Sequence, residues 1–215
     1  NAVHAITLSA VFYVFKCLTT PADPSEAVER GIQALIDQIP GPTPVIDEII
    51  HGTTLVINAI IERKGAKTGL ITTQGFRDVL ELGRELRYDA YDIFSEYPLP
   101  LVPRALRMEV DERIASDGRV IKGLATDDVR RSLAQLRGLG IESLAVCLIN
   151  SYRNPVHERE IKAIVEREAP ELFLSTSFEV LPQIREYERT CTTATNAYVK
   201  PITARYLTKL ASRLE

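Results

Sequence analysis

Residues 126–149, TDDVRRSLAQLRGLGIESLAVCLI, carry the pattern that decides the fold. Thr126 and Asp127 can cap a helix, because their side-chain oxygens accept hydrogen bonds from the free N–H groups of a first helical turn. Apolar residues then recur every three or four positions until Gly138, as on the buried side of a helix. Residues 143–149 follow as an apolar run, which is typical of a strand buried on both faces. This segment predicts a helix packed against a buried strand.

Alternating helices and strands are predicted along most of the remaining chain. Further helices are expected at 24–38, 54–64 and 193–214, and another starts at Asn154-Pro155. Further strands are expected at 45–50, 68–72 and 172–177, with a hairpin over 106–121 that turns at Asp117-Gly118. The alternation predicts an α/β fold with a mixed sheet and flanking helices, and a boundary near 104–125 would divide it into two lobes.

Two segments leave alternatives open. The apolar stretch 5–15 fits either one buried strand or the two strands of a hairpin. Residues 75–103, which are rich in aromatic residues and proline, are expected to be irregular or to form short helices. Long excursions of this kind in compact domains are often functional.

Composition excludes several classes of protein. The chain has 215 residues and a net charge of −3, from 26 Lys and Arg against 29 Asp and Glu, with the two signs interspersed. Such a surface is not typical of a protein that binds nucleic acid. The one long uncharged apolar stretch, 5–15, is too short to span a membrane. Three cysteines without metal-ligand spacing indicate neither a disulfide framework nor a structural zinc site, so a cytoplasmic location is expected.

The turn His51-Gly52-Thr53-Thr54 lies between a predicted strand and a predicted helix. Backbone N–H groups point outward at such a helix start, and two hydroxyls and a permissive glycine add to them, as a phosphate or an oxyanion requires. The alternative is that Thr54 only caps the helix and that His51 is a hydrogen-bonded core residue.

A second group of polar residues ends the next predicted strand. Thr72, Thr73 and Gly75 are expected at the same edge of the sheet as the HGTT turn, so that Thr53 and Thr73 would line one pocket. Arg84 could bind a carboxylate or phosphate through two parallel hydrogen bonds. The alternatives are a strand end followed by a turn and, for Arg84, a surface salt bridge.

The stretch 51–84, HGTTLVINAIIERKGAKTGLITTQGFRDVLELGR, strongly resembles the N-terminal domain of the hydantoinase A and 5-oxoprolinase family, which includes subunits of acetone and acetophenone carboxylases. The resemblance covers the chain from about Val14 to the C-terminus. It continues through LTTPADPSEAV at 18–28, PLVPRALRMEVDERI at 100–114, AVCLINSYRNPVHERE at 145–160 and EVLPQIREYERTCTTATNAYVKP at 179–201.

The resemblance implies one lobe of an actin-like, ribonuclease H-like ATPase that opens a cyclic amide such as a hydantoin or 5-oxoproline. ATP, with Mg, would phosphorylate the carbonyl oxygen before water attacks. The candidate catalytic residues are His51, Thr53 and Thr54. The candidate residues for binding substrate or phosphate are Gly52, Asn58, Thr72, Thr73, Gly75, Arg84 and Arg189. No residue is assigned to a metal.

The resemblance also implies a domain plan and partners. Residues 1–189 would form the N-terminal domain, with possible sub-lobes 1–104 and 105–189, and residues 190–215 would start a following domain. The expected partners are a small cyclic amide, a C-terminal lobe and a hydantoinase B-like subunit, with no nucleic acid and no membrane.

Some residues of the matching stretches also fit plainer interpretations. The charged stretch 185–190, REYERT, could be an exposed edge strand or a segment of an inter-lobe or substrate cleft. His4 and His157 are expected to be solvated, and Cys147 is expected to be an inert core residue.

The chain departs from the family at its start. The family begins with a strand and a phosphate loop of the form DxGGTFTD, where this chain has NAVHAITLSAVFY, with no Gly before Gly31 and no Asp before Asp23. Ile57 also stands where the family commonly has Thr. An actin-type site needs that loop to hold the phosphates and that acid to orient the metal. The chain also ends at Glu215, where family members continue, so it is expected to bind Mg-ATP weakly and to be inactive alone.

Three functions remain open. The chain is expected to belong to a cyclic-amide hydrolase, and the first alternative is a subunit of an ATP-dependent ketone carboxylase. The second alternative is a non-catalytic binding or scaffold domain, which the divergent start would permit.

Overall fold

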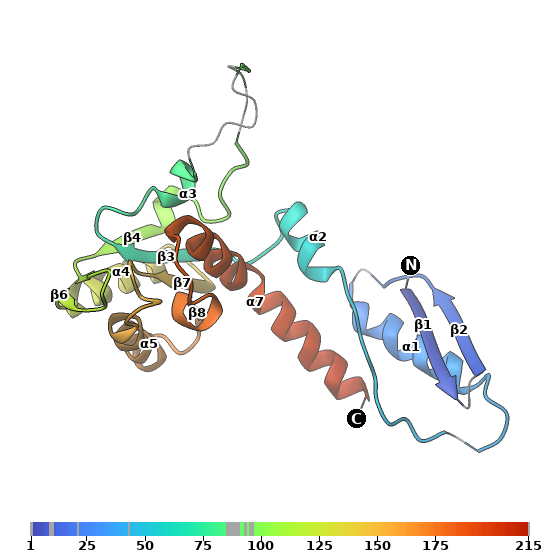
Figure 1. Ribbon diagram of the computed structural model, residues 1–215. Helices are drawn as coiled ribbons and strands as arrows, with labels where there is room; N and C mark the ends of the chain where they lie inside the picture. Colours follow the sequence, from blue (N-terminus) through green and yellow to red (C-terminus); the bar gives the residue numbers. More distant parts are fainter. Residues whose placement is uncertain are drawn as a thin grey trace. The chain divides into compact units, whose positions relative to one another are not determined.

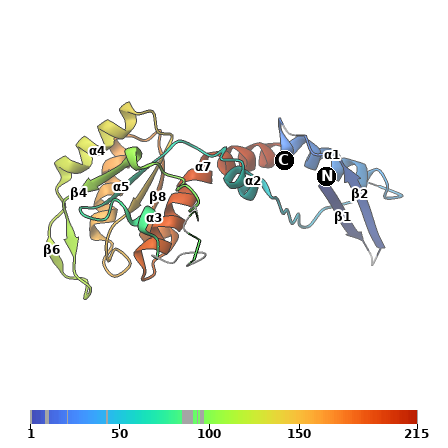
Figure 2. The same cartoon turned by 90° about the horizontal axis from the view of Figure 1, so that it is seen from above.

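A computed structural model describes residues 2–8, 11–20, 22–42, 44–84, 91–92, 94 and 97–214. The chain divides into two compact units, whose helices and strands are shown in Figures 1 and 2. Unit 1 comprises Asn1–Val56 and Ile202–Glu215, and unit 2 comprises Ile57–Pro201. The family-domain boundaries predicted at 104/105 and 189/190 stay predictions.

Unit 2 is built on a parallel four-stranded sheet with the strand order β4-β3-β7-β8. Its strands are β3 (Thr68–Thr73), β4 (Arg107–Val110), β7 (Ser143–Cys147) and β8 (Phe173–Thr176). Every residue of β3 and β7 is buried, as expected for central strands of a parallel sheet that is covered on both faces. The predicted α/β class with flanking helices is confirmed.

Helices cover both faces of this sheet (Figures 1 and 2). The helices α4 (Thr126–Gly138) and α5 (Val156–Glu168) lie on one face, and the first half of α7 (Glu186–Leu214) lies on the other. Thr190 of α7 donates a hydrogen bond to Cys147 Sγ of β7 across the second face. Short elements complete the unit: α2 (Leu55–Ile61, shared with unit 1), α3 (Val79–Leu82), the 3-10 helix η1 (Arg104–Leu106) and α6 (Ser177–Val180).

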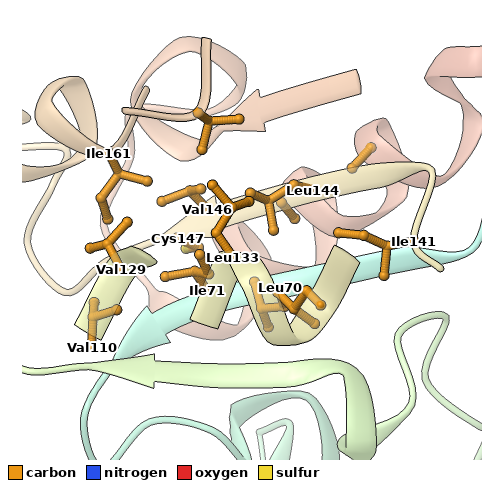
Figure 3. Close-up of a cluster of buried hydrophobic side chains, with 14 of the residues drawn as sticks. Leu70, Ile71, Val110, Val129, Leu133, Ile141, Leu144, Val146, Cys147 and Ile161 are labelled. Atoms are coloured by element: carbon orange, nitrogen blue, oxygen red, sulfur yellow. The ribbon is translucent and has the colours of Figure 1, made fainter. Parts of the chain in front are cut away.

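The hydrophobic core of unit 2 lies between the sheet and its helices (Figure 3). Ile71 and Val146 of the central strands pack with Leu133 of α4 and Ile161 of α5, and each is at most 3% exposed. This is the apolar spacing from which the helices at 126–138 and 156–168 were predicted. The core fixes the strands, and through them the loops that follow the strands.

The predicted hairpin over 106–121 is only partly correct. Residues 107–110 join the parallel sheet as β4, beside β3. The hairpin is shorter and consists of β5 (Arg113–Ile114) and β6 (Val120–Lys122), with Gly118 at φ 92° in its turn. An Asp-Gly pair specifies the turn but does not specify how far the pairing extends.

Unit 1 contains an antiparallel pair, β1 (Ala2–Leu8) and β2 (Val11–Cys17), so the hairpin alternative for the N-terminal stretch is correct. The helix α1 (Pro24–Ile36) begins at the N-cap Asp23, whose carboxylate accepts from Ser25 N–H. Val28 of α1 packs with Tyr206 and Leu210 of α7 in a small core.

The strand predicted at 45–50 is wrong. Residues 44–54 have no regular secondary structure, and Val45 and Ile50 are 87% and 88% exposed. A β-branched apolar run forms a strand only where a neighbouring strand supplies its hydrogen bonds, and none of the described residues pairs with it. The HGTT turn therefore does not follow a strand of the unit 2 sheet, and its expected place beside Thr73 stays a prediction.

The edge-strand alternative for REYERT is wrong as well, because residues 186–190 form the first turns of α7. Glu186 and Glu188 lie where carboxylates stabilise the positive end of a helix. The irregular excursion expected over 75–103 contains α3. Residues 85–90, 93, 95 and 96 of that excursion lie outside the described residues.

Candidate functional site

The carboxyl ends of the parallel strands of unit 2 bring polar residues from distant parts of the sequence to one edge of the sheet. In open α/β sheets the loops beyond this edge are the usual place for ligands. The candidate site is the set of buried polar residues at this edge, here called the carboxyl-edge cluster. It consists of Thr73, Glu112, Ser151, His157, Glu158, Ser177 and Arg189.

Thr73, Glu112 and His157 form a continuous hydrogen-bonded chain. The Thr73 hydroxyl accepts from Ile149 N–H at 2.9 Å and donates to Glu112 Oε1. Glu112 Oε2 lies 2.7 Å from His157 Nδ1. The three residues are 1%, 2% and 4% exposed, so water competes little for these bonds. The chain connects β3, the loop after β4, the loop after β7 and the first turn of α5.

Glu158, the next residue along α5, holds a second network. Its carboxyl group accepts from Leu148 N–H at 2.8 Å, from Phe178 N–H at 3.0 Å and from the Ser177 hydroxyl at 2.6 Å. The Ser177 and Ser151 hydroxyls are 2.9 Å apart, and Ser151 donates to Leu148 O at 3.0 Å. Glu158 thereby joins the loop after β7 to the start of α6.

Burial raises the pKa of Glu158. The hydroxyl network accommodates the neutral acid, because a protonated Glu158 can donate to Ser177, Ser177 to Ser151, and Ser151 to Leu148 O. When Glu158 is ionised, Ser177 donates to it instead, and the single proton of Ser151 serves only one of its two neighbours. The geometry and the direction of the pKa shift therefore agree.

Arg189 is fully buried in the first turns of α7. Its guanidinium donates to Leu148 O at 2.6 Å and to Gln183 O at 3.1 Å, and lies 5.4 Å from the centre of the Tyr152 ring. No carboxylate of the described residues forms an ion pair with it. Its Nε is one of three buried side-chain atoms without a partner in the described part of the chain, with Arg77 Nε and Ser143 Oγ. In this arrangement Arg189 ties α7 to the loop after β7.

The other predicted residues of unit 2 lie at or near the same edge. Thr72 is buried, and its hydroxyl donates at 2.9 Å to the main-chain oxygen of Cys147, its partner in the neighbouring strand β7. Gly75, at φ 88°, turns the chain after β3, and its N–H donates to Glu109 Oε1 at 2.7 Å. Arg84 is half exposed and forms an ion pair with Glu188, which is its surface-salt-bridge alternative.

The predicted residues of the HGTT turn belong to unit 1 and are exposed. Thr53 Oγ1 accepts from Leu55 N–H at 3.2 Å, so Thr53 offers a helix-capping contact to α2. His51 Nε2 lies 2.6 Å from the Tyr206 hydroxyl. Asn58 is exposed on α2. The structure assigns this turn and the carboxyl-edge cluster to different units.

His157 is not solvated as predicted. It is buried beside Glu112, and neither Glu112 nor Glu158 was singled out from the sequence. The available signal was weak: an acid follows the strand at 107–110, and a His-Glu pair opens a helix directly after a buried strand and turn. The expectation that Cys147 is inert agrees with its burial, which raises the pKa of its thiol.

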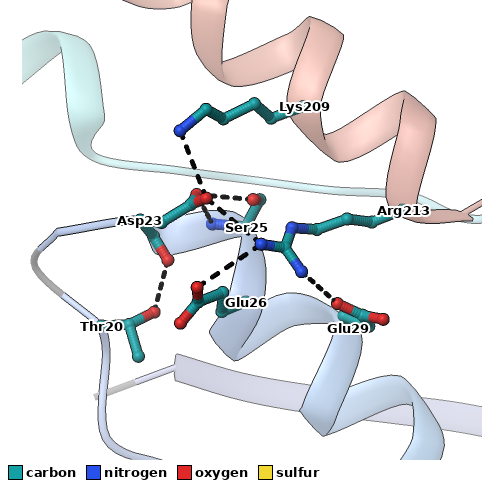
Figure 4. A network of polar contacts seen from close by, with 7 residues as sticks. All are labelled: Thr20, Asp23, Ser25, Glu26, Glu29, Lys209 and Arg213. Carbon is teal, nitrogen blue, oxygen red and sulfur yellow. Dashed lines mark hydrogen bonds and ion pairs between the residues drawn. The ribbon is translucent and has the colours of Figure 1, made fainter.

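Unit 1 carries a separate network of charges around Asp23 (Figure 4). Lys209 and Arg213 of α7 each approach Asp23 Oδ2 at 3.3 Å, and Arg213 also pairs with Glu29 at 2.6 Å. The hydrogen bond from the Ser25 side chain, followed by these cations, lowers the pKa of Asp23 to about 2. These contacts fasten the N-terminus of α1 to the end of α7, and no ligand role follows from them.

The described residues offer no group of three or more His, Cys, Asp and Glu side chains that could hold a metal ion. These residues therefore do not form a protein-only metal cage, and none of them is assigned to Mg. None of the helices in the described part of the chain combines the length and apolar character that a membrane span requires.

The sequence of the chain matches that of known proteins over most of its length. Residues 2–169 match the model of the hydantoinase/oxoprolinase N-terminal region. The chain is 36% identical over 209 residues to caprolactamase subunit alpha of Pseudomonas jessenii, covering 94% of this chain and 30% of the relative. It is 34% identical over 212 residues to the acetophenone carboxylase gamma subunit of Aromatoleum aromaticum, covering 91% and 29%.

A solved structure agrees with these matches. The crystal structure of ATP-dependent caprolactamase from Pseudomonas jessenii superposes with a TM-score of 0.87 at 33% identity, over 98% of this chain and 32% of that one. The chain thus spans about a third of the length of the relatives that it matches.

Proposed function

Since the chain belongs to the hydantoinase/oxoprolinase family, we propose that it is the N-terminal part of an ATP-dependent hydrolase that opens a cyclic amide. The observation that carries this proposal is the joint match in sequence and structure to a caprolactamase, at 33% identity and a TM-score of 0.87. The divergent start of the chain does not oppose it, because the fold is retained over 98% of the chain.

The carbonyl carbon of an amide is a weak electrophile, and the proposed chemistry activates it. ATP transfers its terminal phosphoryl group to the carbonyl oxygen, which makes the carbonyl carbon electrophilic. Water adds to that carbon, and the ring C–N bond breaks with proton transfer to nitrogen, leaving an acyl phosphate and an amine. A second water then attacks the carbonyl carbon of the acyl phosphate, and the C–O bond to the phosphate breaks, which leaves a carboxylate and inorganic phosphate. The sum consumes two waters and one ATP for each ring opened.

The residues of this chain would contribute positioning and charge stabilisation. His51, Gly52, Thr53, Thr54 and Asn58 remain proposed contacts to phosphate or substrate. The same role is proposed for a second group: Thr72, Thr73, Gly75, Arg84 and Arg189. The ion pair of Arg84 and the buried, main-chain-bound guanidinium of Arg189 argue against direct contact by these two, so their proposed role is to hold the loops in place.

Nucleotide binding is proposed to need more than this chain. The stretch NAVHAITLSAVFY lacks the glycines and the acid of the phosphate loop, and the described residues hold no metal-binding group. We therefore expect weak binding of Mg-ATP to the chain alone. The relatives named as alpha and gamma subunits support a partner subunit, for which a hydantoinase B-like chain is the candidate.

A second candidate is an ATP-dependent ketone carboxylase. It is supported by the match to the acetophenone carboxylase gamma subunit, at 34% identity over 91% of this chain. In that case the phosphorylated oxygen would belong to an enol, and bicarbonate would be consumed together with ketone. The scaffold alternative predicts neither reaction.

The experiment that separates these functions is a substrate panel on the intact protein with its partner subunit. ADP release is measured with caprolactam, 5-oxoproline, a hydantoin, or acetophenone plus bicarbonate. The cyclic-amide proposal predicts ADP release matched by ring-opened product with at least one of the first three. Bicarbonate-dependent loss of ketone alone would support the carboxylase, and no stimulated ADP release would support the scaffold.

A further inference from the structure

His157 has two ring nitrogens in different environments. Nδ1 lies 2.7 Å from Glu112 Oε2 inside unit 2. Nε2 has no hydrogen-bond partner among the described residues, yet it is not one of the buried unpartnered side-chain atoms. The His157 side chain keeps 6% of its surface exposed, whereas that of Glu112 keeps none. Nε2 therefore belongs to the small part of the ring that reaches solvent.

The position of the ring is fixed by the chain of hydrogen bonds behind it. Thr73 receives the Ile149 N–H, so its own proton is directed to Glu112 Oε1. That leaves Oε2 to engage Nδ1 of His157. A carboxylate that holds Nδ1–H selects the tautomer whose Nε2 lone pair is free and stabilises the imidazolium that forms when Nε2 takes a proton.

We propose that His157 is a general base whose Nε2 takes a proton from an attacking water, with Glu112 as its positioning residue. The proposal rests on the proposed function and assigns the hydrolytic half of that reaction to the carboxyl-edge cluster.

The proposed step is balanced in protons and electrons. Water gives one proton to His157 Nε2 while its oxygen forms a bond to the activated carbonyl carbon, and the C=N π electrons of the phosphorylated amide move to nitrogen. The C–N bond of the ring then breaks, the leaving nitrogen takes the proton from the imidazolium, and the added hydroxyl loses its proton to solvent as the C=O bond reforms. His157 returns to its neutral form, and Glu112 keeps its charge throughout, as in other carboxylate-oriented histidines.

His157→Asn is the variant that tests the role of Nε2 most selectively. The Asn side-chain amide can still donate to Glu112 from near the place of Nδ1, but it has no basic nitrogen in the place of Nε2. Val156→Ala, at the neighbouring exposed position, is the matched control. In single turnovers of the intact protein with its partner subunit, ADP formation and ring-opened product are measured separately.

The proposal predicts that His157→Asn keeps the rate of ADP formation within about threefold of wild type, while product formation falls by about 10²- to 10⁴-fold, the usual contribution of a general base. An equal loss of both rates, or no loss of product, would overturn it. Val156→Ala should retain both rates.

A second measurement does not depend on activity and keeps the two proposals apart. Diethyl pyrocarbonate acylates unprotonated, accessible imidazole nitrogens, so wild-type His157 should be modified in the folded protein, as mapped by peptide mass. A His157 that stays unmodified while exposed His51 reacts would overturn the proposal even if the amide is hydrolysed. A wild type that is modified at His157 but never opens an amide would instead refute the proposed function.

Discussion

Glu158 shows how one buried residue can join the loop after β7 to the start of α6. Its carboxyl group accepts hydrogen bonds from two main-chain N–H groups, of Leu148 and Phe178, and from the Ser177 hydroxyl. Removing the acceptor leaves these donors buried and unpaired. We expect Glu158→Ala to lower the free energy of unfolding by about 3 kcal/mol, measured by urea denaturation. Glu160→Ala, exposed on the same helix, should change it by less than about 0.5 kcal/mol.

The effect of Glu158 should depend on pH with a definite sign. Burial raises its pKa above the ordinary value of 4.5, so the folded protein holds this proton more tightly than the unfolded chain. The resulting stabilisation is complete below pH 4.5 and is lost as the pH rises through the native pKa. The difference in stability between wild type and Glu158→Ala should therefore be larger at pH 4.5 than at pH 8. A difference that grows with pH would contradict this account.

A substitution at Thr53 can distinguish the two roles considered for the HGTT turn, which are charge stabilisation in catalysis and capping of α2. Its hydroxyl accepts from Leu55 N–H, which a capping role explains. If Thr53 also stabilises charge on a transferring phosphoryl group, Thr53→Val in the intact enzyme should lower kcat by about 10²-fold with little change in KM. If it only caps α2, the same change should cost about 1 kcal/mol of stability and leave turnover per folded molecule intact. Melting temperature and turnover, measured together, distinguish the two.

At the scale of the elements, the loop before β3 passes close to α7. A Cβ atom built on Gly65 would lie 2.1 Å from Tyr198 Cε1, and the next residue, Ala66, donates to Tyr198 O at 2.9 Å. We expect Gly65→Ala to destabilise the protein by about 1–3 kcal/mol through overpacking. The control is Gly138→Ala at the end of α4, where no atom lies within 4 Å of the added methyl group. Equal denaturation midpoints for the two variants would contradict the close packing of α7 on this loop.

The sequence was sufficient for elements whose pattern is set by burial within unit 2. The helix at 126–138 and the strands beginning at 68 and 143 were predicted closely, because their apolar spacing directly reflects the two covered faces of the sheet. The apolar pattern at 45–50 wrongly predicted a strand, because strand formation depends on a pairing partner that a local pattern cannot reveal. The prediction for His157 also failed, because a charged and polar helix start looks solvated until the loop carrying Glu112 is placed over it.

At the scale of the whole molecule, unit 2 has the larger core among the residues whose burial is described. Unit 2 has a parallel sheet covered on both faces, whereas the buried cluster of unit 1 consists of Val28, Tyr206 and Leu210 with partly buried neighbours. We expect residues 57–201, expressed alone, to unfold cooperatively in urea with the far-ultraviolet circular dichroism of an α/β domain. A non-cooperative transition would show that unit 2 depends on unit 1 for its fold.

The measurement that most directly tests the central claim follows the carbonyl oxygen of the substrate. The intact protein and its partner subunit are given ATP and a cyclic amide labelled with ¹⁸O at the carbonyl, in unlabelled water. If ATP phosphorylates that oxygen and water then attacks carbon, the label leaves with phosphorus, so inorganic phosphate should carry one ¹⁸O for each ring opened. Label found only in the new carboxylate, with unlabelled phosphate, would contradict the account.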